Sequence, residues 1–216
     1  MNKSLMRYLL FSVSLIFCCS CASDYRYMKA IETNTTCSSK LAPKLFTTSW
    51  YHASVDVVGR HISGLLLIKN MPDSSYRVVF TNEAGVTFFD FGFAGKENFK
   101  VYNIISQLNK KPVVRTLRKD FELILGLPFR KGPYQAYALN DEIFFGVRQK
   151  KETAYFITNK DCASLRRLEL GSARKRKVVV QLNGQQYPTP DKIELVHNTF
   201  KMQINLTRFE KDDSAQ

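Results

Sequence analysis

The five cysteines carry the most evident chemistry in this chain, and three of them follow a short N-terminal segment. In that segment two basic residues precede a largely apolar run, residues 8–17. This order is typical of a secretory signal peptide, and the run is shorter than the roughly 18 residues that a permanent membrane-spanning helix needs. Signal peptidases require a small side chain before the cleaved bond, and Cys21 follows Ser20. The sequence therefore predicts cleavage before Cys21.

Segment 17–21 resembles a lipobox, in which a cysteine after a small residue is acylated and becomes the new N-terminus. It departs from that pattern in one place, because Cys18 stands where a leucine is usual. We expect a lipid on Cys21 that anchors the mature chain to a membrane of the cell envelope. Ordinary secretion and an uncleaved anchor are the alternatives.

Two cysteines, Cys37 and Cys162, remain in the mature chain. An even pair in an oxidising compartment favours one disulfide. The alternative is two buried, unpaired thiols, because free cysteine is among the most buried residue types. Neither arrangement has the spacing of a zinc site, and we expect no metal and no cofactor.

Catalysis finds little support in the remaining reactive groups. The histidines are scattered over predicted strands, without a metalloprotease or nucleophile-elbow pattern: His52, His61 and His197. Asp120 and Glu122 are two residues apart on a predicted helix and point to different sides. Cys162 follows Asp161 but has no placed histidine. We expect a protein that is not an enzyme.

The chain is strongly basic, with a formal net charge of +13. Two of the 32 Lys and Arg residues and none of the 19 acids lie in residues 1–20, so the mature chain keeps +11. In the envelope, anionic lipid head groups are a better partner for this charge than nucleic acid. The run Arg174, Lys175, Arg176 and Lys177 is the candidate phosphate-binding patch, and a solvated hairpin tip is the alternative.

We divide the chain into a signal peptide (1–20), a lipidated tether and approach segment (21–45) with one short helix near residues 25–31, one domain (46–210) and a tail (211–216). In the domain, residues 49–57, 62–69, 76–81 and 86–93 alternate between apolar and polar residues and are separated by turn residues. This pattern predicts an antiparallel meander with one buried face.

After these strands the spacing of the apolar residues changes from alternating to helical. A helical turn or two is expected at residues 104–108, and a helix from Pro112 to Leu127 carries apolar residues at helical spacing. Strands resume over residues 142–148, 154–158, 165–170, 178–182, 192–196 and 201–209. About ten strands and one central amphipathic helix predict a mainly β fold: a curved antiparallel sheet, or incomplete barrel, whose concave face the helix covers.

Four stretches, residues 63–69, 76–80, 85–90 and 188–195, resemble the lipoprotein-localisation proteins LolA and LolB. The resemblance implies a half-barrel lined with apolar side chains that accepts acyl chains of lipoproteins. The predicted anchor favours the tethered, LolB-like role, in which lipoproteins arrive from a LolA-like carrier at the periplasmic face of the outer membrane. Ala22 and Ser23 lack the aspartate that signals inner-membrane retention in some bacteria. However, loop 82–85 offers only Ala84 where that receptor exposes a bulky apolar residue.

Twelve apolar residues are the candidate lining of a lipid cavity, since each belongs to the buried face of a predicted strand: Leu66, Ile68, Val78, Phe80, Phe89, Phe91, Phe145, Val180, Ile193, Leu195, Met202 and Ile204. Each would serve equally well in a core without a ligand. Two hypotheses therefore remain: an acceptor or carrier of acyl chains or lipoproteins, and a structural or interaction lipoprotein whose half-barrel is filled by its own side chains.

Overall fold

The computed structural model describes residues 23–42, 46–57, 59–94, 98–130, 133–184 and 190–209. The signal peptide, Cys21 and the tail 211–216 lie outside the described residues. The described elements are β1 (Lys29–Ile31), α2 (Thr35–Leu41), β2 (Ser49–Val57), β3 (Arg60–Asn70), β4 (Tyr76–Thr81), β5 (Thr87–Ala94), β6 (Asn98–Ile104), α3 (Lys111–Ile124), the 3₁₀ turn η2 (Leu127–Phe129), β7 (Gln135–Leu139), β8 (Glu142–Gln149), β9 (Glu152–Asn159), β10 (Leu165–Gly171), β11 (Arg176–Asn183), β12 (Lys192–His197) and β13 (Met202–Arg208).

The strands form one antiparallel sheet in the order β1-β7-β8-β9-β10-β11-β12-β13-β2-β3-β4-β5-β6. Neighbours in the sheet are neighbours in the chain, except where β1 pairs with β7 and β13 pairs with β2. The second exception joins two meanders into one surface. In the described part of the chain β1 and β6 are edge strands, so the sheet stays open. The prediction of a mainly β, curved and unclosed antiparallel sheet is confirmed.

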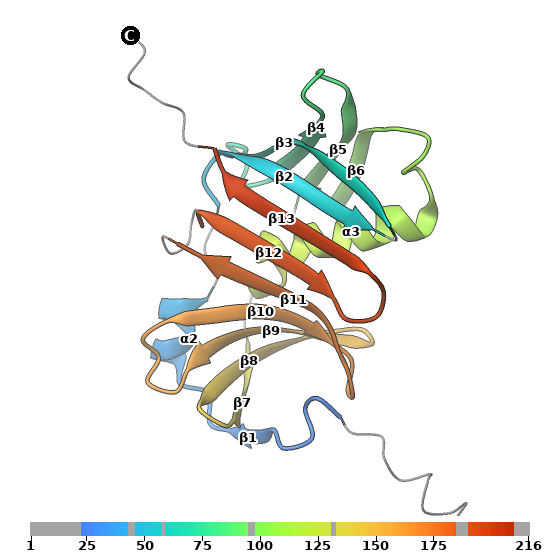
Figure 1. Cartoon of the computed structure of the whole chain (residues 1–216). Coiled ribbons are helices and arrows are strands. Elements are labelled where there is room, and N and C mark those ends of the chain that lie inside the picture. The colour runs from blue at the N-terminus through green and yellow to red at the C-terminus, as the bar shows by residue number, and fades with distance from the viewer. Residues whose placement is uncertain are drawn as a thin grey trace, which may run out of the picture.

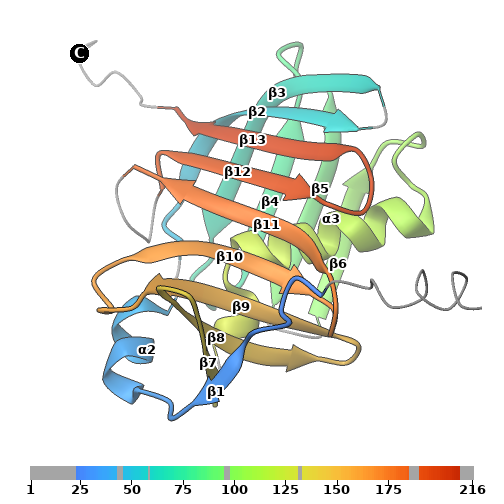
Figure 2. The same ribbon diagram turned by 60° about the horizontal axis from the view of Figure 1, so that its bottom comes forward.

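The helix α3 lies on the concave side of this sheet. Figures 1 and 2 show it enclosed between β3–β6 on one side and β10–β13 on the other. Pro112 stands in its first turn, as predicted, where a missing N–H costs nothing. Its inward stripe, with Leu117, Phe121 and Ile124 fully or nearly fully buried, packs against the sheet. The curvature therefore surrounds one amphipathic helix.

The alternating strand faces follow the sequence pattern. On β3, Leu66 and Ile68 are buried, and on β5 the same holds for Phe89, Phe91 and Phe93. Because side chains alternate in a strand, these residues share the concave face with those of the neighbouring strands. One continuous core between sheet and helix results.

Several local predictions differ from the structure. Residues 25–31 contain a turn followed by β1 rather than a helix, and the helix of this region is α2. β6 and β7 had no predicted counterpart. Ile104 ends β6, and the expected helical turn begins one residue later, where the Ile105 carbonyl accepts hydrogen bonds from the N–H groups of Leu108 and Asn109 (3.0 Å each).

A disulfide joins Cys37 to Cys162, with their Cα atoms 5.6 Å apart, which confirms the predicted pair. It attaches α2 to the turn between β9 and β10. Asn34 caps α2, since its side-chain oxygen accepts a hydrogen bond from the Cys37 N–H at 2.9 Å. The described helices include none that could cross a membrane, and the described residues hold no cluster of three or more metal-ligating side chains.

Candidate functional site

An apolar cleft of about 360 Å³ lies between the N-terminal half of α3 and the concave face of the sheet. This volume falls within the range of about 300 to 1,000 Å³ that is common for small-molecule pockets. The residues around the cleft are apolar except for one threonine: Val55, Val57, Ile62, Phe80, Phe89, Leu108, Pro112, Val113, Thr116, Leu117, Phe200 and Met202. The cleft therefore suits an uncharged, apolar ligand.

The sheet contributes one side of the cleft through cross-strand neighbours. Three pairs lie directly opposite each other in the register, namely Val55 with Ile62, Phe80 with Phe89, and Val57 with Met202. Directly opposite side chains in an antiparallel sheet are close enough to pack together. Five strands, β2 to β5 and β13, thus form one apolar surface.

Aromatic rings form the deepest part of that surface. The ring centroids of Phe80 and Phe89 are 5.6 Å apart, and Phe89 is also 5.6 Å from Phe121 of α3. Phe89 stacks on Phe91 at 4.5 Å. These contacts hold the rings from several sides, so the aromatic wall of the cleft is continuous with the core.

The helix and the segment before it supply the opposite side. Val113 and Leu117 are four residues apart and lie on the same helix face. Leu108 precedes the helix in the hydrogen-bonded turn at residues 105–109. Val113 is only partly buried, whereas Leu117 is 6% exposed. The cleft consequently opens toward the N-terminal end of α3.

Phe200, in the turn between β12 and β13, lies at the entrance and is 42% exposed. Its ring packs on the His197 ring, with centroids 4.4 Å apart. His197 Nε2 lies 3.0 Å from a carboxylate oxygen of Asp120 on α3, and both side chains are almost fully buried. Burial raises the pKa of Asp120, while the contact with His197 opposes this rise. The His197–Asp120 pair therefore connects α3 to the end of β12, next to the turn that carries Phe200.

A second, polar pocket of about 310 Å³ adjoins the cleft and shares Thr116 and Phe200 with it. There Glu152 accepts hydrogen bonds from Lys119 (2.6 Å) and Lys177 (2.8 Å). Burial alone would raise the pKa of Glu152, but the two ammonium groups outweigh it and lower the pKa. Cationic groups thus stand beside an apolar cleft, the arrangement that an amphiphile with an anionic head would use.

The twelve residues expected to line a cavity do not all do so. Phe80, Phe89 and Met202 line the cleft. The others are buried in the packed core away from it: Leu66, Ile68, Val78, Phe91, Phe145, Val180, Ile193, Leu195 and Ile204. In the part of the chain that the structure describes, most of the half-barrel predicted as a cavity is therefore filled by the chain's own side chains, and the apolar cleft lies beside the N-terminal half of α3.

Sequence reasoning also missed most of the residues that do line the cleft. Val55, Val57 and Ile62 continue the alternation of predicted strands, so a signal for them was available. Val113 and Leu117 were part of the predicted helix face. No periodic pattern could identify Phe200, which stands in a turn.

The predicted basic patch is divided by the structure. Arg174 and Lys175 are exposed in the turn between β10 and β11. Arg176 makes an ion pair with the fully buried Glu169 at 2.9 Å, and Lys177 binds Glu152. Two of the four residues thus have structural partners on the protein.

The three histidines belong to separate surroundings. His61 lies 2.7 Å from Asp56 at an exposed position, and His52 packs on Phe209 with ring centroids 5.1 Å apart. His197 belongs to the buried pair with Asp120. Cys162 is held in the disulfide. These groups do not converge on one site.

No protein-family model and no curated protein sequence matches the chain. Among the solved structures that are similar to it in part are the following two. A DUF1329 family protein from Desulfovibrio piger has 10% sequence identity and a TM-score of 0.45, with 79% of this chain and 88% of that chain covered. An outer membrane lipoprotein-sorting protein domain from Vibrio parahaemolyticus has 7% identity and a TM-score of 0.42, with 84% and 91% covered.

Proposed function

We propose that this chain is a lipoprotein of the cell envelope that binds acyl chains in the cleft between α3 and strands β2 to β5 and β13. The single observation that carries the proposal is that this cleft, of about 360 Å³, is apolar apart from Thr116. Exposing an acyl chain to water costs about 0.8 kcal/mol per CH₂. A cleft that covers part of such a chain therefore supplies a driving force for binding.

The anchor completes this proposal. Acylated Cys21 would hold the domain at a membrane. In its more specific form, the proposed role is LolB-like: the chain would accept lipoproteins from a LolA-like carrier at the periplasmic face of the outer membrane. A single acyl chain anchors only marginally, so several chains or an additional attraction are needed for stable attachment.

Binding of a fluorescent fatty-acyl probe tests the proposal. Val113→Trp places an indole in the cleft and should lower probe affinity at least tenfold. Arg115→Trp puts the same side chain on the exposed part of α3 and should leave affinity within twofold of the wild type. Mass spectrometry of lipids co-purified with the intact protein provides an independent readout.

The second candidate is a structural or protein-interaction lipoprotein without lipid cargo. The observation that favours it is that nine of the twelve expected lining residues belong to the closed core. A wild-type domain that binds no acyl probe and carries no co-purified lipid would overturn the acyl-binding proposal and leave this alternative.

A further inference from the structure

The antiparallel sheet brings every second hairpin turn to the same end of the molecule. The described residues of five turns lie at the end where the cleft opens, and we name it the cleft end: Gly59 and residues 82–86, 150–151, 172–175 and 198–201. The described turn residues at the opposite end include Cys162 of the disulfide, and we name it the disulfide end: residues 71–75, 140–141 and 160–164, together with Gly184, Pro190 and Asp191.

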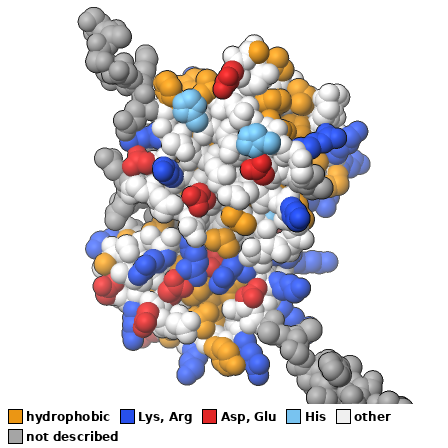
Figure 3. All heavy atoms as spheres, in the orientation of Figure 1, with side chains coloured by type: hydrophobic (Ala, Val, Ile, Leu, Met, Phe, Trp, Pro, Cys, Tyr) orange, Lys and Arg blue, Asp and Glu red, His pale blue; other side chains and the backbone are white. Residues whose placement is uncertain are grey.

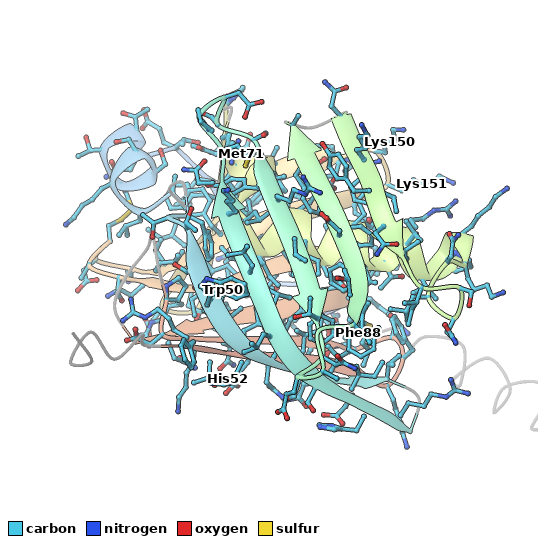
Figure 4. The ribbon with its side chains drawn as sticks, turned by 90° about the horizontal axis from the view of Figure 1, so that it is seen from above. Trp50, His52, Met71, Phe88, Lys150 and Lys151 are labelled. Atoms are coloured by element: carbon cyan, nitrogen blue, oxygen red, sulfur yellow. A yellow bond between two sulfur atoms is a disulfide. The ribbon has the colours of Figure 1, made fainter. Side chains whose placement is uncertain are left out.

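The two ends carry opposite charge in the described parts of their turns. At the cleft end the charged turn residues are Lys150, Lys151, Arg174, Lys175, Lys201 and one acid, Glu83. At the disulfide end they are Asp73, Asp141, Asp161, Asp191 and one base, Lys160. In Figure 4 the labelled Lys150 and Lys151, from the turn between β8 and β9, lie to the right of Met71, from the turn between β3 and β4. The basic turn residues are thus gathered at the same end of the sheet as the mouth of the cleft.

Further residues beside the mouth have the same character. Lys110 and Lys111 are exposed at the start of α3, and Arg60 is exposed at the start of β3. Two apolar side chains of the cleft-end turns, Val86 and Phe200, are 52% and 42% exposed. In Figure 3 Lys and Arg side chains line much of the right-hand edge of the molecule. A basic rim with exposed apolar tips suits the interface of an anionic bilayer.

The chain also enters the fold at this end. The Asp24 N–H donates to the Arg174 carbonyl at 3.0 Å, and an Asp24 carboxylate oxygen accepts from the Arg176 N–H at 2.7 Å. The neighbouring Tyr25 is buried, and its hydroxyl donates to Glu169 at 3.0 Å. Cys21 is three residues before Asp24, so an extended chain places it within about 11 Å of this turn. An anchor on Cys21 would therefore leave from the basic turn.

We propose that the cleft end docks on the anionic membrane surface that holds the anchor, so that the mouth of the apolar cleft faces the lipid head groups. This docking surface rests on the proposed lipid anchor and extends it to an orientation. The bases would add an electrostatic attraction to the hydrophobic attachment by the lipid anchor. An acyl chain could then pass between bilayer and cleft with little exposure to water.

The orientation is testable with the acylated full chain on vesicles of phosphatidylethanolamine and phosphatidylglycerol. Because Cys37 and Cys162 are bonded, a fluorophore attaches selectively to a new thiol at Ala173→Cys in the cleft end or Asp141→Cys in the disulfide end. A quencher carried on lipid head groups should reduce emission at position 173 at least threefold more than at position 141. Equal quenching, or stronger quenching at position 141, would overturn the orientation.

The electrostatic part has a matched pair of variants, tested on the non-acylated Cys21→Ser chain by co-sedimentation with phosphatidylglycerol vesicles. Lys151→Gln, Lys175→Gln and Lys201→Gln together should weaken binding by about fivefold per charge removed. The control Lys40→Gln, Lys160→Gln and Lys192→Gln removes as many exposed bases away from the cleft end and should change binding less than threefold. Equal losses in both variants would contradict docking by the cleft end.

These outcomes are separate from those of the acyl-binding test. A chain that binds the acyl probe but shows no preferred orientation keeps the proposed function and loses the docking surface. A chain that orients on the membrane but binds no acyl probe keeps the docking surface and loses the acyl-binding function.

Discussion

The two ends of the sheet are built differently, although the same strands run between them. At the disulfide end the helix α2 is cross-linked to the β9–β10 turn, and Arg130 lies over the Tyr76 ring at 4.8 Å while it donates a hydrogen bond to the Ser74 carbonyl. At the cleft end the helix and the sheet separate and leave an apolar opening with a basic rim. The covalent cross-link therefore lies at one end of the sheet, and the apolar cleft opens at the other.

The difference shows that one alternating pattern can build both a closed core and an open cleft. β3 contains both cases, since Ile68 near its end is fully buried whereas Ile62 near its start borders the cleft and is partly buried. The decisive factor is what covers the residue. The predictions that follow separate the two ends experimentally.

The largest expected effect is loss of the disulfide. Replacing Cys37 and Cys162 by serine opens a loop with a sequence separation of 125 residues. The chain-entropy model then gives a loss of about 4 to 5 kcal/mol in the free energy of unfolding. Denaturant titration measures this loss, and acyl-probe affinity of the still folded variant should remain within twofold, because the cleft lies at the other end. A variant that stays as stable as the wild type would show that the cross-link does not hold the disulfide end.

The next effect compares two isoleucines of one strand. Ile68→Ala leaves a void in a closed core and should cost about 2 to 5 kcal/mol. Ile62→Ala enlarges a space that is already open, so we expect a cost below about 1.5 kcal/mol in the free energy of unfolding and a changed probe affinity. Equal destabilisation by both substitutions would contradict the distinction between the two ends.

A smaller effect is expected at the outer face of the cleft end. Tyr25→Phe removes the hydroxyl that donates to the buried Glu169, at a cost of about 1.5 to 3 kcal/mol. Hydrogen exchange at residues 23–28 should increase, because the segment loses its side-chain hydrogen bond to β10. Unchanged exchange would show that the hydrogen bond does not fix the entry of the chain.

The smallest effect is a dependence on pH. Ion pairs with Lys119 and Lys177 lower the pKa of Glu152, so they stabilise the fold fully above the ordinary carboxyl range and less as the pH falls through the lowered pKa. Their contribution should be about 1 kcal/mol or less. Glu152→Gln should therefore lose less stability than the wild type between pH 5 and pH 3 in thermal melts. Parallel pH profiles would exclude this role.

Much of the fold could be predicted because strand alternation reports burial directly. The faces of β3 and β5, the first turn of α3 and the disulfide pair agree with the sequence pattern. The missed elements lack that signal. β6 is an edge strand with mostly exposed residues, and β1 has three residues that are all exposed. The helix α2 is seven residues long and depends on Asn34 and the disulfide.

The cleft could be predicted only in part, for a different reason. Leu66 and Ile62 have the same type of side chain and the same strand face, yet Leu66 is packed and Ile62 borders open space. The separation between α3 and each part of the sheet decides this, and no local pattern encodes a separation. The position of Phe200 likewise depends on its contact with His197, the last residue of β12.

Photolabelling tests the central claim most directly, because it reports where a ligand lies. A fatty acid with a photoreactive group near its methyl end is incubated with the intact protein, irradiated and located by peptide mass spectrometry. We expect saturable labelling of peptides that contain residues 55–62, 108–117 and 200–202, and loss of that labelling in Val113→Trp. Labelling that is absent, cannot be competed by unlabelled fatty acid, or concentrates at the disulfide end would contradict the account.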